Sequence, residues 1–158
     1  MELLVLAVGR LRPSYREAVD DYLRRLGRHH KVREIEVREA SRAPTVEAQR
    51  REEAERIRAR LPAGGRMVAL AREGAGWSSE ELARRLGTWL REARPVALVI
   101  GGSHGLDPVL LAAAADRWSL GPLTLPHELA RVVVAEQLYR AGTILRGEPY
   151  HKGGGTRG

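Results

Sequence analysis

The polar side chains best suited to chemistry lie in the last third of the sequence. Arg131, Glu136 and Arg140 interrupt an otherwise apolar helical stretch that starts at His127, and the segment Pro149-Tyr150-His151-Lys152 follows it. Charged groups in an apolar helix need a partner or a function, because burying an unpaired charge is costly. An imidazole can move a proton near neutral pH, and a guanidinium can stabilise developing negative charge. The candidate catalytic residues are His127, Arg131, Glu136, Arg140, Tyr150 and His151.

Simple structural roles are open for the same residues. Glu136 and Arg140 stand four positions apart, in the order that favours an ion pair on a helix surface. Chain ends are ordinarily mobile, which applies to the segment from Pro149 onward. His29-His30 ends a predicted helix and is expected to interact with the last carbonyl groups of that helix. Residue types alone leave both the structural and the catalytic roles open.

Two uncharged loops form a second candidate site. The apolar segment Val99-Ile100 runs into a glycine-rich turn, Gly101–Gly105, and Leu120 precedes the proline-stiffened loop Gly121–Pro126. In open α/β sheets, ligands bind beyond the carboxyl ends of the strands. Main-chain groups of such loops can hydrogen-bond an adenine, and the lack of charge suits a ligand with a sulfonium and no phosphates. A plain tight turn and a core-packed connection are the alternatives for the two segments.

Several other kinds of site are excluded by the same residues. No Gly-Lys-Ser/Thr follows the glycines at 101–105, so they are not a Walker loop, and their spacing is not that of a dinucleotide fingerprint. The five histidines show no metal-binding spacing, and no metal site is predicted. The absence of cysteine excludes disulfides and cysteine-based zinc sites.

Hydrophobic periodicity predicts strands alternating with helices. The predicted strands are Leu3–Val8, a more exposed Val32–Val37, Met67–Ala71, Pro95–Ile100 and Trp118–Leu120. The predicted helices are Tyr15–Leu26 with Ser14 as N-cap, Thr45–Leu61 with Thr45 as N-cap, 78–92, a short one opened by Asp107-Pro108, and 127–145. This order predicts one α/β domain over residues 1–158, with a mostly parallel sheet flanked by helices. Residues 153–158 are expected to form a flexible tail.

The charge balance indicates a polyanionic partner. Lysine and arginine number 27 against 20 acidic residues, which gives a net charge of +7. A basic excess raises the encounter rate with nucleic acid, and arginine suits phosphate because its fork donates two hydrogen bonds. No apolar stretch is long enough to span a bilayer, and the start lacks a basic signal-peptide region. We therefore expect a cytoplasmic protein without membrane contact.

The chain as a whole resembles the RlmH family of SPOUT-class methyltransferases. The specific parts of this resemblance are the block from Leu123 to Val132, its continuation from Ala135 to Ala141, and the end Pro149–Lys152. The segments Leu6–Arg10, Val99–Leu106 and Trp118–Leu120 also match. One departure is that Gly153–Gly158 follows the Tyr-His-Lys motif, where family members usually end within a residue or two.

The resemblance implies the fold, the reaction and the partners. It implies a C-terminal trefoil knot, S-adenosyl-L-methionine (SAM) as cofactor, and a homodimer in which each pocket is completed by the partner. The implied reaction is methylation of N3 of a pseudouridine in 23S rRNA on assembled ribosomes. By matching position, the cofactor-binding residues are Leu70, Ala71, Gly101, Gly102, Gly105, Leu120, Gly121, Pro122, Leu123, Thr124, Leu125 and Pro126. His104 is assigned no catalytic role, because its turn position varies in the family.

Three competing functions remain at the level of sequence. They are a SPOUT enzyme acting on tRNA, a non-catalytic ribosome-binding protein, and a nucleotide-binding enzyme that reads adenine through the glycine turn. The Arg-rich helix from Arg50 to Arg60 is expected to be a solvated face rather than an RNA contact.

Overall fold

The computed structural model describes residues 1–150. Strands and helices alternate along the chain as β1 (Glu2–Val8), α1 (Pro13–Leu26), β2 (Lys31–Val37), α2 (Val46–Arg58), β3 (Arg66–Gly76), α3 (Ser79–Glu92), β4 (Val96–Ile100), α4 (Pro108–Ala113), β5 (Asp116–Ser119) and α5 (His127–Arg146). The predicted elements are all present, with ends that shift by a few residues. His151 and the tail 153–158 lie outside the described residues.

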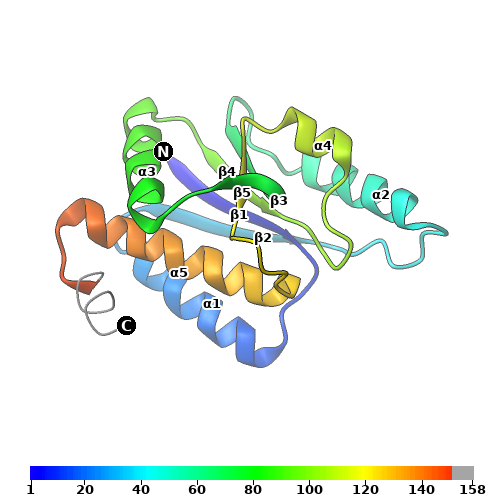
Figure 1. The fold of residues 1–158 in the computed structure, drawn as a ribbon, viewed down its shortest axis with the longest axis horizontal. Coiled ribbons are helices and arrows are strands. Elements are labelled where there is room, and N and C mark those ends of the chain that lie inside the picture. Colours follow the sequence, from blue (N-terminus) through cyan, green and yellow to red (C-terminus); the bar gives the residue numbers. More distant parts are fainter. Residues whose placement is uncertain (151–158) are drawn as a thin grey trace.

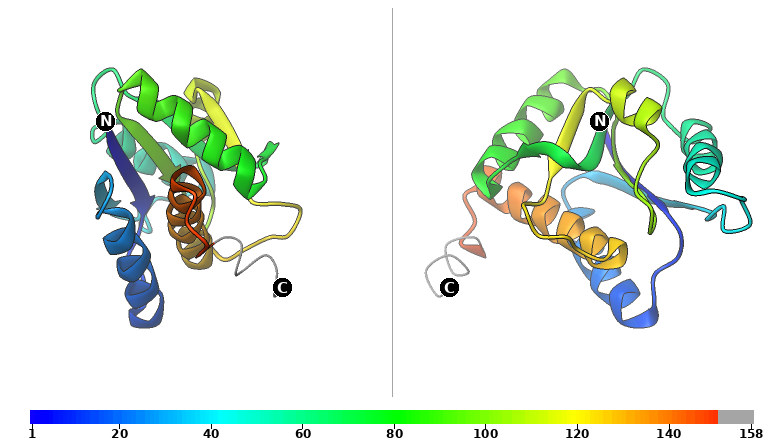
Figure 2. Two further views of the ribbon diagram at one scale, coloured as in Figure 1. Left: turned by 90° about the vertical axis from the view of Figure 1, so that its left-hand side faces the viewer. Right: turned by 45° about the vertical axis from the view of Figure 1, so that its right-hand side comes forward.

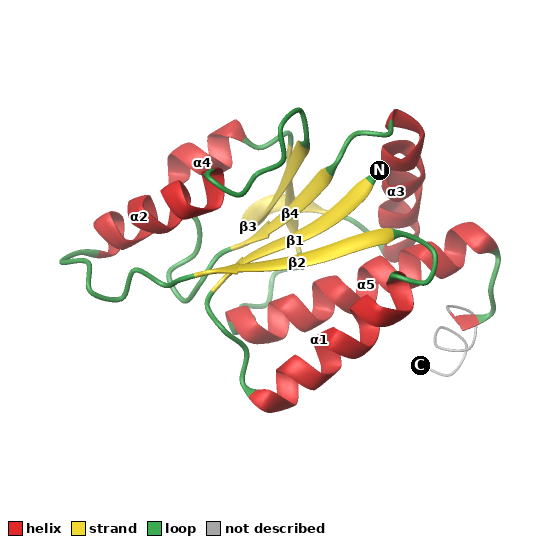
Figure 3. Cartoon of the chain, turned by 180° about the vertical axis from the view of Figure 1, so that it is seen from behind, coloured by secondary structure: helices red, strands yellow, loops and turns green. Residues whose placement is uncertain are grey.

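A single parallel sheet organises the molecule. Its five strands run in the order β2-β1-β4-β3-β5, and every pairing is parallel. Helices α1, α3 and α5 cover one face, and α2 and α4 cover the other (Figures 1 and 3). The α/β prediction is confirmed. The trefoil knot implied by the resemblance stays a prediction.

Alternation along the central strands builds two cores. In β1, Leu3 and Val5 join the core under α1, α3 and α5, whereas Leu4 and Leu6 join the core under α2 and α4. A strand buried on both faces reads as a continuous apolar run, which is why β1 and β4 were visible in the sequence. The predicted exposure of β2 is confirmed, because this strand lies at one edge of the sheet.

The N-cap predicted for α1 is wrong, whereas those predicted for α2 and α4 are confirmed. Ser14 was expected to cap α1, but the helix begins at Pro13 after Arg12, without a side-chain cap, and Ser14 lies inside the first turn. Proline fits the first helical position, since its missing N–H has no partner there anyway. Thr45 and Asp107 cap α2 and α4 as predicted, each accepting a hydrogen bond from a backbone N–H of the first turn.

Strand β3 is longer than predicted and carries a bulge. The pattern ended the strand at Ala71, whereas β3 continues to Gly76 with a register shift between Leu70 and Ala75 against β5. Both Leu70 and Ala75 pair with Trp118, so the four residues between them loop out of the ladder. Gly74 permits this path, because a Cβ there would lie 2.6 Å from the backbone of Arg117. The bulge turns Ala71 and Arg72 toward the edge where the strands end.

Candidate functional site

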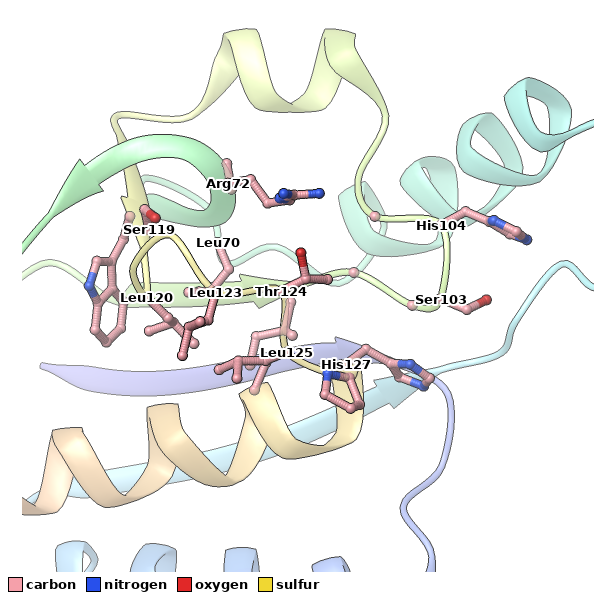
Figure 4. A pocket seen from close by; sticks show the side chains of 18 of the residues that line it. Leu70, Arg72, Ser103, His104, Ser119, Leu120, Leu123, Thr124, Leu125 and His127 are labelled. Carbon is pink, nitrogen blue, oxygen red and sulfur yellow. The ribbon is translucent and has the colours of Figure 1, made fainter.

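A hollow lies where β3, β4 and β5 end. It has a volume of about 770 Å³, and its walls come from the bulge of β3, the turn after β4, the loop after β5 and the start of α5 (Figure 4). Cavities of this size hold drug-sized ligands. The position follows the general rule for parallel sheets, in which loops at the carboxyl ends of strands carry the ligand site.

The turn after β4 is closed by direct contact between glycines. Gly105 N donates a 3.1 Å hydrogen bond to Gly102 O, and Gly105 has a positive φ of 77°. A Cβ on Gly101 would lie 2.7 Å from the carbonyl carbon of Gly105, so no larger residue fits without moving the backbone. Glycine at these positions therefore sets the shape of the cavity wall and exposes its main-chain groups.

The loop after β5 forms the opposite wall. Gly121 has a φ of 118°, a conformation that L side chains rarely adopt, and its N–H donates to Ser119 Oγ at 3.2 Å. Leu123 is 76% exposed, which is unusual for a large apolar side chain beside a cavity. Figure 4 shows Leu120, Leu123 and Leu125 gathered on one side of the hollow. This wall offers apolar surface together with main-chain hydrogen-bonding groups.

Most residues that the sequence assigned to the cofactor line this cavity. Of the twelve, only Pro122 is not among the lining residues. Sequence reasoning missed Arg50, Arg72 and Trp118, which also line it. No local signal identified Arg72, because the bulge of β3 that brings it to the cavity depends on pairing with β5. His104 lines the mouth, with its ring pointing away from the hollow (Figure 4).

His127 belongs to the cavity as well. It is the first residue of α5, whose N-cap is Pro126. Glu128 accepts hydrogen bonds from the backbone N–H of Arg12 at 2.6 Å and from its Nε at 3.1 Å. These bonds fix the start of α5 against the β1–α1 loop and hold His127 at the edge of the cavity.

A second polar cluster lies along the second half of α5 and the segment that follows it. Glu136 Oε2 accepts hydrogen bonds from Arg140 Nη2 and from the Tyr150 hydroxyl, both at 2.8 Å. The guanidinium of Arg140 also lies over the Tyr150 ring, 4.9 Å from its centroid, and Tyr139 packs edge-on against that ring. Gln137 donates to the other oxygen of Glu136 at 2.7 Å. The structure therefore brings together three of the predicted catalytic residues and orients them.

Burial and hydrogen bonding shift the pKa values of this cluster. Burial, and then the hydrogen bond to Glu136, raise the pKa of Tyr150 far above its usual value. Burial opposes the charge of Arg140, but the hydrogen bond and charge of Glu136 outweigh it, so the pKa of Arg140 is also raised. At neutral pH the phenol thus keeps its proton and the guanidinium its charge. Tyr150 is a hydrogen-bond donor here and not a base.

Arg131 occupies a different kind of place. Its side chain is 1% exposed, and Nη2 donates to the carbonyls of Val8 at 3.2 Å and Gly9 at 2.9 Å. Its Nη1 pairs with Glu36 and, at 3.4 Å, with Glu34. A guanidinium occupied in this way has no face left for a substrate. In this structure Arg131 ties α5 to the ends of β1 and β2.

The described residues of the predicted constellation are thus divided among three places: His127 at the cavity, the Glu136–Arg140–Tyr150 cluster, and the buried Arg131. His127 and Arg140 are 13 positions apart on the same helix, which corresponds to about 20 Å at 1.5 Å per residue. Within residues 1–150, no group of three or more histidine, aspartate or glutamate side chains is arranged to hold a metal ion. No helix in that part of the chain is long and apolar enough to cross a membrane.

Relatives of known name match along almost the entire chain. A protein of Rubrobacter xylanophilus called ribosomal RNA large subunit methyltransferase H is 55% identical over 152 residues, covering 93% of this chain and 96% of its own. A protein of the same name from Anaeromyxobacter sp. (strain Fw109-5) is 48% identical over 153 residues, covering 96% of this chain and 100% of its own.

Solved structures and a family comparison agree on the fold. The probable methyltransferase from Bordetella pertussis Tohama I superposes with a TM-score of 0.55 at 18% identity, covering 88% of this chain and 95% of that one. A probable methylase family protein from Haemophilus influenzae gives a TM-score of 0.53 at 12% identity, with 94% and 69% covered. The family described as "Predicted SPOUT methyltransferase" matches residues 1–151. The resemblance stated from the sequence is therefore confirmed, and the chain belongs to the SPOUT methyltransferase family.

Proposed function

We propose that this protein transfers a methyl group from SAM to N3 of a pseudouridine in 23S rRNA of assembled ribosomes. It acts in the cytoplasm, as a homodimer of single-domain subunits. The observation that carries the proposal is the cavity of about 770 Å³ between the Gly101–Gly105 turn and the loop after β5. The names of the relatives, which are large-subunit rRNA methyltransferases, support the choice of substrate.

The cavity fits SAM in size and chemistry. Its walls are main-chain groups of glycine turns and apolar side chains, which suit an adenosyl group without phosphates. Among the described residues, no aspartate or glutamate lines the cavity, whereas the guanidinium-bearing Arg72 is one of its lining residues. Arg72 would hold the methionine carboxylate of SAM, since a guanidinium pairs with a carboxylate through two hydrogen bonds. When bound, SAM supplies an electrophilic methyl group on its sulfonium.

Two subunits are needed to assemble one complete site. The cavity with His127 and the Glu136–Arg140–Tyr150 cluster are about 20 Å apart along α5, too far for one base to touch both. A second copy that packs antiparallel along α5 would bring its cluster to the cavity of the first. The partly exposed Leu129, Val132 and Val133 of α5 supply an apolar surface for that contact.

The residues have separable roles in the transfer. N3 of the pseudouridine loses its proton as the bond to the methyl carbon forms, and the sulfonium becomes a thioether. His127 or His151 accepts that proton as the general base. Arg140, oriented by Glu136, stabilises the negative charge that develops on the ring, and Tyr150 packs against the base.

Tritium transfer from labelled SAM tests the proposal. We expect label in 23S rRNA when the substrate is ribosomes that lack the modification, and none in tRNA. Arg140→Ala should abolish transfer while SAM still binds in calorimetry, whereas the exposed Arg84→Ala serves as a control with normal transfer. Transfer to tRNA instead would assign a different RNA, and SAM binding without any transfer would favour a ribosome-binding role. Full activity of Arg140→Ala would refute the proposed site.

A further inference from the structure

A second hollow lies beside the donor cavity, at the ends of the other two strands. It has a volume of about 600 Å³ and is lined by Gly9, Arg10, Glu36, Val37, Arg38 and Glu39. Because β1 neighbours β4 in the sheet, the second hollow opens on the same edge as the cavity of about 770 Å³. Strands are about 4.8 Å apart, so the end of β2 is about 10 Å from that of β4.

Cations around this hollow are left without acidic partners. Arg10 and Arg38 line the hollow, and Arg42 lies in the loop that follows β2. All three are exposed, and none of them takes part in an ion pair in the described part of the chain. The nearby acidic groups are instead bound within the protein. Glu36 pairs with Arg131 and, at 2.6 Å, with Arg16.

Two further carboxylates of this region are occupied in the same way. Glu128 is bound by Arg12, and the buried Glu53 accepts a hydrogen bond of 3.0 Å from the backbone N–H of Ala40. Only Glu39 among the lining carboxylates has no such partner in residues 1–150. The lining thus carries two unpaired guanidinium groups, Arg10 and Arg38, against one unpaired carboxylate, Glu39.

Hydrogen bonds fix the backbone that carries these arginines. Gly9 N donates to Val37 O at 2.8 Å, and its carbonyl accepts from Arg131 at 2.9 Å. On the β2 side, Arg56 donates to the carbonyl of Arg38 at 2.7 Å. Because this backbone is already fixed, binding a charged ligand has to order only the arginine side chains and not the chain that carries them.

The arginines on the helices over one face of the sheet differ in this respect. On α1 and α3, most guanidinium groups face a carboxylate of their own helix or the adjacent strand, as Arg24 does with Asp21 and Arg84 with Glu81. Those pairs neutralise the surface over the helices on that face of the sheet. The rim at the ends of β1 and β2 instead presents the unpaired guanidinium groups of Arg10 and Arg38 on the same edge of the sheet as the donor cavity.

We propose that Arg10, Arg38 and Arg42 bind backbone phosphates of the ribosomal RNA next to the target nucleotide. This inference rests on the proposed function. The guanidinium fork matches phosphate, and contacts of this kind position an RNA without reading its sequence. When the target base is held at the donor cavity, the RNA backbone a few nucleotides from it crosses the same edge of the sheet.

Equilibrium binding to ribosomes lacking the modification tests the proposal. The variant combines Arg10→Gln, Arg38→Gln and Arg42→Gln. The control combines Arg28→Gln, Arg58→Gln and Arg60→Gln, which removes three exposed charges away from this rim. Each phosphate contact adds roughly 0.7 to 0.9 to the slope of log affinity against log salt. The first variant should bind at least ~10-fold more weakly and lower that slope by about 2 to 3, while the control stays close to the original protein.

The outcomes separate this proposal from the proposed function. Equal weakening in both triple variants, or no change in the first, would overturn the phosphate rim. SAM affinity, measured by calorimetry, should be the same in the original protein and in both triple variants, because none of the substituted residues lines the donor cavity. If the first triple variant alone loses ribosome affinity and the original protein transfers no methyl group, the proposed function fails while the rim stands.

Discussion

The hydroxyl of Tyr150 donates a 2.8 Å hydrogen bond to Glu136 Oε2, joining the segment after α5 to the middle of that helix. Arg140 donates to the same oxygen, so one carboxylate orients both a phenol and a guanidinium. A carboxylate that holds two groups in this way limits their motion before any substrate arrives. The cluster is thus a preformed unit, which the proposed second subunit would present as a whole.

Removing the phenol hydroxyl should weaken catalysis more than binding. In Tyr150→Phe the ring keeps its contacts with Tyr139 and Arg140 but no longer donates to Glu136. We expect kcat to fall roughly 10-fold, in line with the loss of one positioning contact, with unchanged SAM affinity. Steady-state transfer to ribosomes measures this, and Tyr15→Phe on α1 is the control. A variant as active as the original would show that the bond has no role in positioning.

Replacing the buried arginine should destabilise the fold. Arg131→Met removes the donor to Val8 and Gly9 and leaves Glu36 with one partner fewer. Breaking a buried charged network costs on the order of 3 kcal/mol in free energy of unfolding, measured by urea denaturation. Arg33→Met, whose arginine is 52% exposed and pairs with Glu2, should change stability by less than about 0.5 kcal/mol. Similar values for both variants would contradict the anchoring role of Arg131.

Stability should fall as the solution becomes mildly acidic. Burial, followed by the charges of Arg146 and His29, lowers the pKa of His30, and its Nε2 is buried without a hydrogen-bond partner in the described structure. The unfolded chain takes up this proton at about pH 6.5, the folded protein only at lower pH. Stability attributable to His30 is therefore complete above that pH and declines below it.

The variant His30→Gln tests this pH dependence. Its melting temperature should drop less than that of the original protein between pH 7.5 and pH 5, whereas the exposed His104→Gln should follow the original. An identical pH profile for His30→Gln would assign the acid sensitivity to other groups.

Filling the glycine turn should weaken binding of the methyl donor. Gly101→Ala places a Cβ 2.7 Å from the backbone of Gly105, so the turn has to shift and the cavity wall shifts with it. We expect SAM affinity, measured by calorimetry, to fall at least ~10-fold, since misplaced main-chain donors leave polar groups of the ligand unpaired. Gly76→Ala is the matched control, because nothing lies within 4 Å of a Cβ there. Normal SAM binding in Gly101→Ala would separate the turn from the donor site.

Much of the fold was readable because local signals agreed with it. Local residue types alone determine the continuous apolar runs of β1 and β4. The same holds for the helix caps at Thr45 and Asp107. Ser14 was wrongly predicted to be the N-cap of α1. Proline also favours the first position of a helix, and Pro13 directly precedes Ser14 in the sequence.

The unpredicted parts of the site depend on contacts distant in sequence. Arg72 reaches the cavity through a bulge that exists only opposite β5. Arg131 was indistinguishable from Arg140 in an apolar helix. Its partners Val8, Gly9 and Glu36 lie 95 or more positions away, and only the fold brings them to it. The sequence shows which residues of α5 are polar, but only the tertiary structure determines which of them are buried.

Complementation between two inactive variants tests the shared site most directly. Gly101→Ala damages the donor cavity and Arg140→Ala damages the cluster, so each homodimer should be inactive. A mixed dimer holds one intact cavity facing one intact cluster across the subunit boundary. We predict that co-expressed, purified mixed dimers transfer methyl groups to ribosomes at about half the rate of the original dimer, since one of two sites is restored. Mixed dimers as inactive as their parents would show that cavity and cluster work within one subunit, and would contradict the account.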